Sequence, residues 1–338
     1  MGLNKRLISS EAAGAALFDL VTYTGNGTSQ TFTTNIAPDL VITKSRSFVE
    51  KTNVFDSVRG ATKRMYLNND FSESATANSL TSFNSDGWSI GSWTDMNTNG
   101  ATFVGWAWQA GGAASDNTNG DMTSQVSANV NNGFSIVRYT KVSGQTTVGH
   151  GLSQKPDIIF TKRYNGSSNW LVFTDVTGTH GYLTTTSTAG LTAYASSPNS
   201  TTFNSYYDTG WEIINYCFHS VSGVSKIGSY TGNGNASFGT SAVAQSITTG
   251  FEPRFVLIKI TSTTDHWILF DSERKNTSTT YSQYQSLYPN LTTIEQSASS
   301  GGGYWHMVDF TSTGFDLGQD PSLMVNKNGA TYIYMAFA

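Results

Sequence analysis

The stretch Asn328-Gly-Ala-Thr-Tyr-Ile-Tyr-Met-Ala-Phe-Ala338 closely repeats an earlier one, Asn99-Gly-Ala-Thr-Phe-Val-Gly-Trp-Ala-Trp108. The Asn-Gly pair supplies two residues that tolerate positive φ, and the following run is rich in the β-branched and aromatic residues that buried strands require. Each stretch therefore predicts a turn followed by a strand. A weaker third copy, Gly-Trp-Glu-Ile-Ile-Asn-Tyr-Cys-Phe, occupies residues 210–218. We infer that one strand-closing segment is used three times.

Other markers recur around these copies in a constant order. A strand running into a turn occupies residues 20–27, 136–140 and 227–234. A strand that begins with proline, where no ladder hydrogen bond is lost, occupies residues 38–44, 156–162 and 253–259. A third marker occupies residues 54–59, 269–274 and, more loosely, 171–175, and a fourth occupies residues 86–91 and 313–318. The constant order predicts an internal repeat, with variable loops at residues 63–80, 179–205 and 275–303.

Short strands separated by turn signals predict an all-β fold: three tandem homologous antiparallel β-sandwich units, jelly-roll or lectin-like, with a short N-terminal arm. The predicted parts are the arm 1–18, unit one 19–112, a linker or loop 113–132, a degenerate unit two 133–226 and unit three 227–338. The alanine-rich run of the arm is compatible with a short helix, which is too short to be stable alone. The arm is interpreted either as a frayed terminus or as a docking segment.

Composition excludes several function classes. Only 12% of the residues are charged, against about 25% in an ordinary soluble protein. The net charge is −4 and the basic residues form no stripe, so we expect no nucleic-acid partner. The single cysteine, Cys217, rules out an internal disulfide framework. No window resembles a membrane span or a signal peptide, so we expect synthesis in a cytoplasm without export and no membrane insertion.

Several phrases of the sequence resemble a known group of proteins. They are Tyr-Thr-Gly-Asn-Gly (residues 23–27), Phe-Asp-Ser-Val-Arg-Gly-Ala-Thr-Lys (55–63), Leu-Thr-Ser-Phe-Asn-Ser-Asp-Gly-Trp (80–88) and the final Asn-Gly-Ala-Thr segment. Together they resemble the repeat domains of uncharacterised bacteriophage structural proteins, common in marine phages. The resemblance covers nearly all of residues 19–338 and carries no catalytic residues. It implies a virion component of the tail, a fibre or the capsid surface, and a homo-oligomer in which a trimer would suit a fibre.

The sequence nominates no catalytic, cofactor-binding or metal-ligating residue, and we expect no enzyme activity and no cofactor. Its seven glutamates and five histidines are spread over all units. Cys217 and His219 would stand side by side on a strand about 6.5–7 Å apart, beyond hydrogen-bonding reach, so Cys217 is predicted to be a small core residue. The pairs Asp56/Arg59 and Asp271/Arg274 are predicted to cap turns and pair locally. A glycan-degrading enzyme would need two carboxylates at a defined separation, and no spacing here nominates a pair.

Aromatic residues are the better clue, because they make up 13% of the chain. Val104, Trp106 and Trp108 should share one face of their strand and belong to the core. Four tryptophans near loops are instead candidates for contact with a glycan or with another subunit: Trp88, Trp93, Trp211 and Trp305.

These observations predict a non-enzymatic virion structural protein that acts through subunit assembly and outward-facing loops. Its N-terminal arm would dock on other virion proteins through Lys5, Arg6, Leu7 and Ile8. The alternative function is a lectin-like receptor-binding module that recognises host-surface glycan.

Overall fold

The computed structural model describes residues 16–234, 245–276, 283–296, 307–318 and 324–338, and the account below concerns these residues. Nearly all regular structure in them is antiparallel β-sheet, so the all-β prediction is confirmed. The helical elements of this part of the chain are the short α1 (Thr94–Asn97) and the 3-10 helix η1 (Ser272–Arg274). No helix in these ranges is long and apolar enough to cross a membrane.

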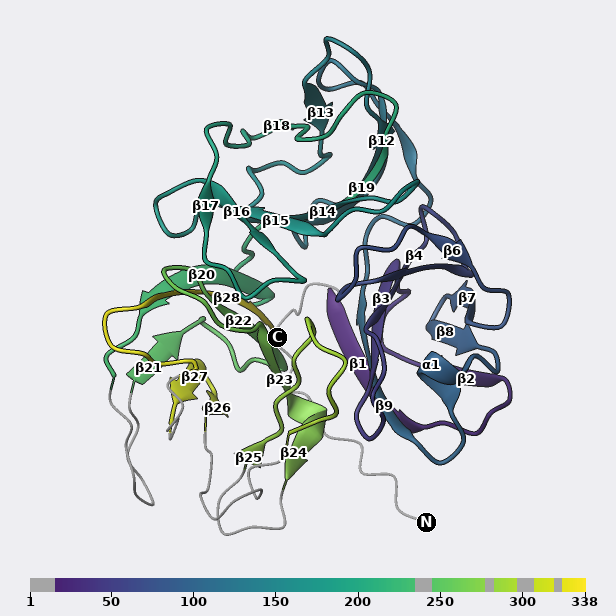
Figure 1. Cartoon of the computed structure of the whole chain (residues 1–338), viewed down its shortest axis with the longest axis vertical. Helices are drawn as coiled ribbons and strands as arrows, with labels where there is room; N and C mark the ends of the chain where they lie inside the picture. Colours follow the sequence, from purple (N-terminus) through teal and green to yellow (C-terminus); the bar gives the residue numbers. More distant parts are fainter. Residues whose placement is uncertain (1–15, 235–244, 277–282, 297–306, 319–323) are drawn as a thin grey trace.

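The strands form three groups around a common centre (Figure 1). The first strand group contains a six-stranded sheet and a three-stranded sheet. In sheet order the larger comprises β1 (Phe18–Thr24), β9 (Thr102–Trp108), β3 (Leu40–Ser45), β4 (Asn53–Asp56), β5 (Lys63–Tyr66) and β6 (Ser74–Ala75). The smaller comprises β2 (Gln30–Thr33), β8 (Gly87–Ile90) and β7 (Leu80–Asn84).

The second strand group contains an eight-stranded sheet and a strand pair. The sheet comprises β10 (Ser115–Asn117), β11 (Ser124–Asn129), β12 (Phe134–Thr140), β19 (Glu212–Phe218), β14 (Ile158–Arg163), β15 (Leu171–Thr174), β16 (Gly181–Thr184) and β17 (Thr192–Ala193). The pair comprises β13 (Thr147–Gly149) and β18 (Thr202–Asn204). The prediction of a linker at residues 113–132 is therefore wrong: β10 and β11 lie there. The sequence pattern did not indicate these two strands because they are mostly polar. They extend the edge of the sheet and bury few apolar side chains.

The third strand group contains three sheets. Its four-stranded sheet comprises β20 (Ser225–Thr231), β28 (Thr331–Phe337), β22 (Phe255–Ile260) and β23 (Ile268–Asp271). A three-stranded sheet comprises β21 (Gln245–Thr248), β27 (Gly314–Leu317) and β26 (Val308–Thr311). The remaining pair comprises β24 (Lys275–Asn276) and β25 (Gln283–Tyr284).

One strand order recurs in the large sheet of every group. It reads β1-β9-β3-β4, β12-β19-β14-β15 and β20-β28-β22-β23. The register recurs as well, because the residue after each strand-opening Pro-Asp or Pro-Arg pair lies opposite the aromatic residue that ends the neighbouring strand: Leu40↔Trp108, Ile158↔Phe218 and Phe255↔Phe337. The second strand in each order is the segment that the sequence repeats. The predicted turns before β9 and β28 are present, with Gly100 and Gly329 at φ of 78° and 71°.

Each large sheet has two buried faces, as β9 illustrates. Val104, Trp106 and Trp108 point toward the centre of the molecule, which confirms their predicted shared face. The opposite face of the sheet packs against the small sheet β2-β8-β7. A Cβ atom at Gly105 would lie 2.6 Å from a ring carbon of Trp88, so only glycine leaves room for this indole.

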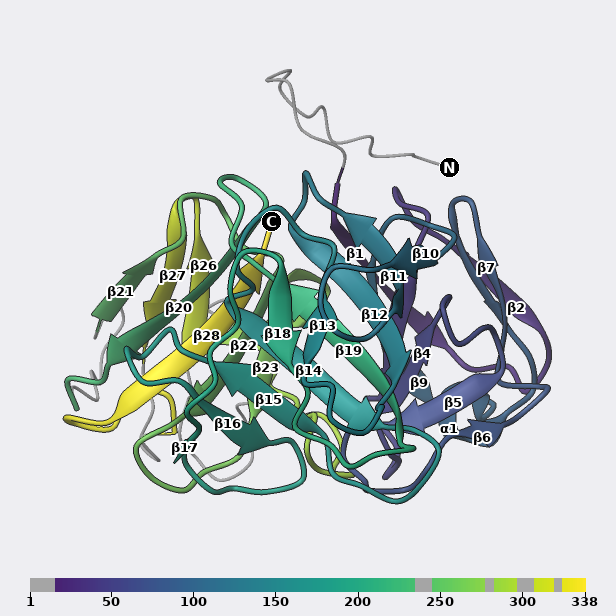
Figure 2. The ribbon, with the colours of Figure 1, turned by 90° about the horizontal axis from the view of Figure 1, so that it is seen from above.

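The central core joins all three strand groups. Trp108, Phe218 and Phe337 end the three corresponding strands, and their ring centroids lie 5.7–6.4 Å from one another. A cavity of about 50 Å³, lined by apolar surface, lies beside them. Phe18 stacks on Phe337 at 5.5 Å, so the start of β1 and the end of the chain lie at the same end of the molecule (Figure 2).

Candidate functional site

A buried lysine near the end of each proline-led strand connects neighbouring strand groups. Lys44, Lys162 and Lys259 are each no more than 1% exposed. Each Nζ donates to a backbone carbonyl oxygen of another group: Lys44 to Leu291 at 2.8 Å, Lys162 to Asp70 at 3.3 Å and Lys259 to Thr188 at 3.1 Å. The first group thus binds the third, the second binds the first and the third binds the second. We call this closed set of contacts the lysine ring.

Backbone hydrogen bonds connect the same pairs of groups as the lysine ring does. The residue two positions after each of these lysines accepts a bond from a loop amide of the group that the lysine contacts. These bonds are Glu73 N to Tyr164 O at 2.9 Å, Leu191 N to Thr261 O at 2.7 Å and Glu295 N to Arg46 O at 2.8 Å. Loops that differ in sequence therefore meet the neighbouring group in the same way, because main-chain groups make the contact.

Burial lowers the pKa of each ring lysine to about 8. A buried ammonium loses its hydration, which carbonyl dipoles, remote carboxylates and, for Lys162, the ring of Trp170 replace only in part. These cations are therefore held at a cost to the free energy of folding.

Two buried ion pairs add further contacts between groups. Arg59 Nε lies 2.6 Å from Asp56, and Arg274 Nε lies 2.7 Å from Asp271, which confirms the predicted local pairing. Each aspartate also accepts a hydrogen bond from a neighbouring group. Tyr216 Oη donates to Asp56 at 2.7 Å, and Trp106 Nε1 donates to Asp271 at 2.8 Å.

The corresponding hydrogen bond from the third group to the second is absent, because both of its side chains are replaced. Thr174 takes the place of the aspartate at the end of β15, and Met335 takes the place of the donor in β28. The buried charge and its inter-group donor are absent together, so neither group leaves an uncompensated partner. The sequence shows the local pairs through their i,i+3 spacing, but not the donors, which are distant along the chain.

No cluster of three or more His, Cys, Asp or Glu side chains within the described residues could hold a metal ion. Cys217 is fully buried, and burial raises the pKa of its thiol, as expected of a core residue. His219 Nδ1 lies 3.1 Å from the carbonyl oxygen of Ser220.

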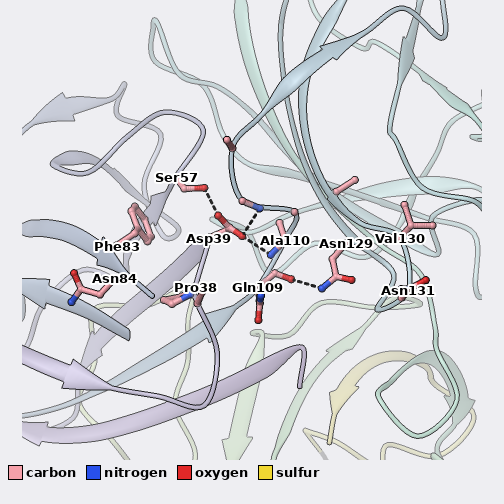
Figure 3. A pocket seen from close by; sticks show the side chains of 15 residues that line it. Pro38, Asp39, Ser57, Phe83, Asn84, Gln109, Ala110, Asn129, Val130 and Asn131 are labelled. Carbon is pink, nitrogen blue, oxygen red and sulfur yellow. Dashed lines mark hydrogen bonds between the residues drawn. The ribbon is translucent and has the colours of Figure 1, made fainter. Parts of the chain in front are cut away.

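An open pocket of about 680 Å³ lies where the chain passes from the first to the second strand group (Figure 3). Its one titratable lining residue is Asp39, whose carboxylate accepts bonds from Ser57 Oγ at 2.7 Å and from two backbone amides, those of Ala110 and Gly112, at 2.9 and 3.2 Å. Its bonds to the amides of Ala110 and Gly112 tie the crossover segment to the start of β3.

Neutral groups line the rest of this pocket, among them Phe83, Asn84, Gln109 and Asn131. Asn84 is engaged by Ser82 and Ser89. The pocket can therefore offer amide groups and one aromatic ring to a polar ligand, beside the carboxylate of Asp39.

The predicted tryptophan contacts are not brought together on one surface. Trp88 is fully buried, so the prediction that it touches a glycan or another subunit is wrong: the alternation of β8 turns it inward. Trp93 and Trp211 are half-buried in different strand groups, each beneath an arginine: Arg64 at 4.7 Å and Arg163 at 4.2 Å. Trp305 lies outside the described residues, as do the arm residues Lys5, Arg6, Leu7 and Ile8.

A tyrosine cluster that sequence reasoning missed covers the outer face of the second strand group. It comprises Tyr182, Tyr194 and Tyr206 around Phe173, with His180 beside them. Tyr206 is 43% exposed. The available signal was the density of tyrosines in a Ser- and Thr-rich segment, which the loop assignment of residues 179–205 obscured.

Comparison with known proteins identifies a family that covers most of the chain. The model of a family described as a domain of unknown function (DUF7483) matches residues 13–338. No curated protein and no solved structure matches the chain.

Proposed function

We propose that this chain, which belongs to the DUF7483 family of domains of unknown function, is a non-enzymatic structural component of a bacteriophage virion. The virion assignment follows from the resemblance of its repeated phrases to phage structural proteins. The chain would act through assembly, with its outward loops facing solvent or partners, on the tail, a fibre or the capsid surface.

We propose further that the three strand groups are homologous β-sandwich units produced by duplication of one template. The recurring strand order and register support this, as does the second layer on the outer face of each large sheet. Unit two then includes β10 and β11, and so begins before residue 133.

One observation carries the structural role: the lysine ring and its backbone bonds repeat in rotation around the centre. Each group is fixed to both others, and the faces that meet are apolar and aromatic. Such a ring resists separation of its parts without disulfides, as a particle component must.

Mass spectrometry of purified particles tests the proposal directly. The chain should be present at a fixed copy number after particles are banded and washed in high salt. Its recovery only in the soluble lysate would contradict the proposal. Mass measurement of the isolated protein by light scattering would show whether it forms the proposed homo-oligomer, for which a trimer is favoured.

The structure also sharpens a test of the proposed docking arm. Leu17 and Phe18 are each 2% exposed and belong to the central core, so a truncation must stop before them. Deleting residues 1–15 should leave the fold intact and abolish incorporation into particles. Normal incorporation of this variant would refute the docking role of Lys5, Arg6, Leu7 and Ile8.

A second candidate function is lectin-like recognition of host-surface glycan. The observation that favours it is the tyrosine cluster, because an exposed aromatic ring beside neutral polar groups suits the face and hydroxyls of a sugar.

A further inference from the structure

We infer that the tyrosine cluster of the second strand group binds an uncharged saccharide, with a sugar hydroxyl inserted beneath the rings; this rests on the second candidate function. Four observations carry the inference: the arrangement of the rings, the reason they are there, the polar atoms below them and the absence of Asp, Glu, Lys and Arg from the cavity lining.

The rings form an inclined rim. Tyr182, Tyr194 and Tyr206 each have their ring centroid 5.4–5.8 Å from that of Phe173, and Tyr206 lies 5.5 Å from each of the other two tyrosines. The planes meet at 52–67°, so the rings form the walls of a shallow cup and not a flat stack. The exposed ring of Tyr206 is the surface on which a sugar face can lie.

The cup exists because the second group has a thinner outer layer. The first and third groups cover this face with three-stranded sheets, whereas the second has only the pair β13 and β18. Phe55 and Phe270, which hold the place of Phe173 in their groups, are fully buried, while Phe173 is 8% exposed. Tyrosines from the segment after β15 replace the missing strand, and they bring hydroxyl groups to the surface.

Unpaired polar atoms line a small cavity beneath the rim. Its volume is about 20 Å³, which suits one hydroxyl or hydroxymethyl group and excludes a whole sugar ring. Asn215 and His180 both line it. Asn215 is 1% exposed, and its Nδ2 donates to Val137 O at 3.1 Å, yet its Oδ1 is buried without a partner in the described structure. His180 Nδ1 is in the same state.

A buried acceptor without a donor destabilises a fold, so a ligand that donates a hydroxyl hydrogen to Asn215 recovers part of the lost free energy on binding. A sugar supplies that hydroxyl together with a face of C–H groups for the tyrosine rings. No Asp, Glu, Lys or Arg lines the cavity, which favours a neutral saccharide over a sugar acid or a phosphate.

The test is saturation-transfer NMR and calorimetric titration of the full chain with glucose, galactose, mannose and N-acetylglucosamine, with glucuronate as the charged comparator. At least one neutral sugar should bind, and glucuronate should bind more weakly. Tyr206→Ala should weaken the binding about five- to tenfold, and Tyr206→Phe should retain most of it. Phe71→Ala is the matched control, since Phe71 is 53% exposed in the first strand group, and it should change nothing.

Three results would overturn the inference. The first is that the folded protein binds none of the sugars, a result that would leave the structural proposal intact. Binding survives Tyr206→Ala but is lost in Gln109→Ala, which moves glycan recognition to the pocket of Figure 3. Alternatively, Tyr206→Ala blocks incorporation into particles without affecting sugar binding, which makes the cluster a subunit contact.

Discussion

The lysine ring predicts that the protein becomes more stable as the pH rises from 7 to 9.5. Burial lowers the pKa of Lys44, Lys162 and Lys259 from 10.5 to about 8. Between these two values the unfolded chain binds more protons than the folded one, so the free energy of unfolding rises with pH. Below pH 8 both states carry the protons, and the full cost of the buried charge remains.

The expected magnitude follows from the pKa values. The difference corresponds to about 3 kcal/mol for each lysine, of which about 2 kcal/mol is recovered between pH 7 and 9.5. For three lysines the free energy of unfolding rises by about 6 kcal/mol. This is an upper bound, because the carbonyl acceptors favour the charged lysine in the folded state and so reduce the pKa shift. Cys217 opposes the rise by about 1 kcal/mol, since its buried thiol stays protonated while the unfolded thiol titrates.

Buried tyrosines limit the upper end of this window. Burial raises the pKa of Tyr23, Tyr139 and Tyr207 above their ordinary value near 10. The unfolded chain loses these phenol protons first, so stability should fall again above about pH 10. The lysine contribution is therefore best measured at or below pH 9.5.

The assay is urea unfolding followed by tryptophan fluorescence at pH 7, 8, 9 and 9.5. The midpoint should rise across this range in the natural chain. Lys162→Met should remove about one third of the rise, whereas Lys226→Met, at an exposed position in β20, should leave it unchanged. A flat or falling midpoint, or an equal rise in Lys162→Met, would refute the reasoning about the ring.

Three further outcomes test the core and the inter-group contacts. Trp106→Phe removes the indole donor to Asp271 and should lower the free energy of unfolding by about 1–3 kcal/mol; urea unfolding that matches the natural chain would contradict the role of this bond. Gly105→Ala places a methyl group 2.6 Å from the buried indole in β8 and should cost about 1–3 kcal/mol; a thermal midpoint that is unchanged would show that the indole can move. Extending the deletion of residues 1–15 to residues 1–18 should abolish cooperative unfolding in calorimetry, because it also removes Leu17 and Phe18 of the central core; a cooperative transition in the longer deletion would refute this.

Much of the fold follows from local pattern. The Asn-Gly turns, the proline-led strands and the alternation around Trp106 each specify a strand through a few adjacent residues, and each strand is present. The same reasoning misplaces Trp88, because a tryptophan beside an Asp-Gly turn resembles a loop residue. Its burial depends on Gly105, which lies in a strand of the opposing sheet.

The contacts between groups lie beyond local pattern. A lysine that ends an apolar strand usually extends its charged end to solvent, and nothing near Lys162 in the sequence indicates that Asp70 will cover it. The carbonyl group that each lysine contacts depends on which strand group lies beside it, and that arrangement depends on the closure of the whole ring. The tyrosine cluster was missed for a similar reason, since it compensates for a strand that the second group lacks.

Hydrogen exchange at the three loop amides of Glu73, Leu191 and Glu295 tests most directly whether the groups are locked into one ring. Each amide bonds to a carbonyl of a neighbouring group. All three should exchange as slowly as the amides of β9, β19 and β28, because they open only when the ring opens. Exchange at the rate of free loops, at any one of the three, would contradict the closed ring.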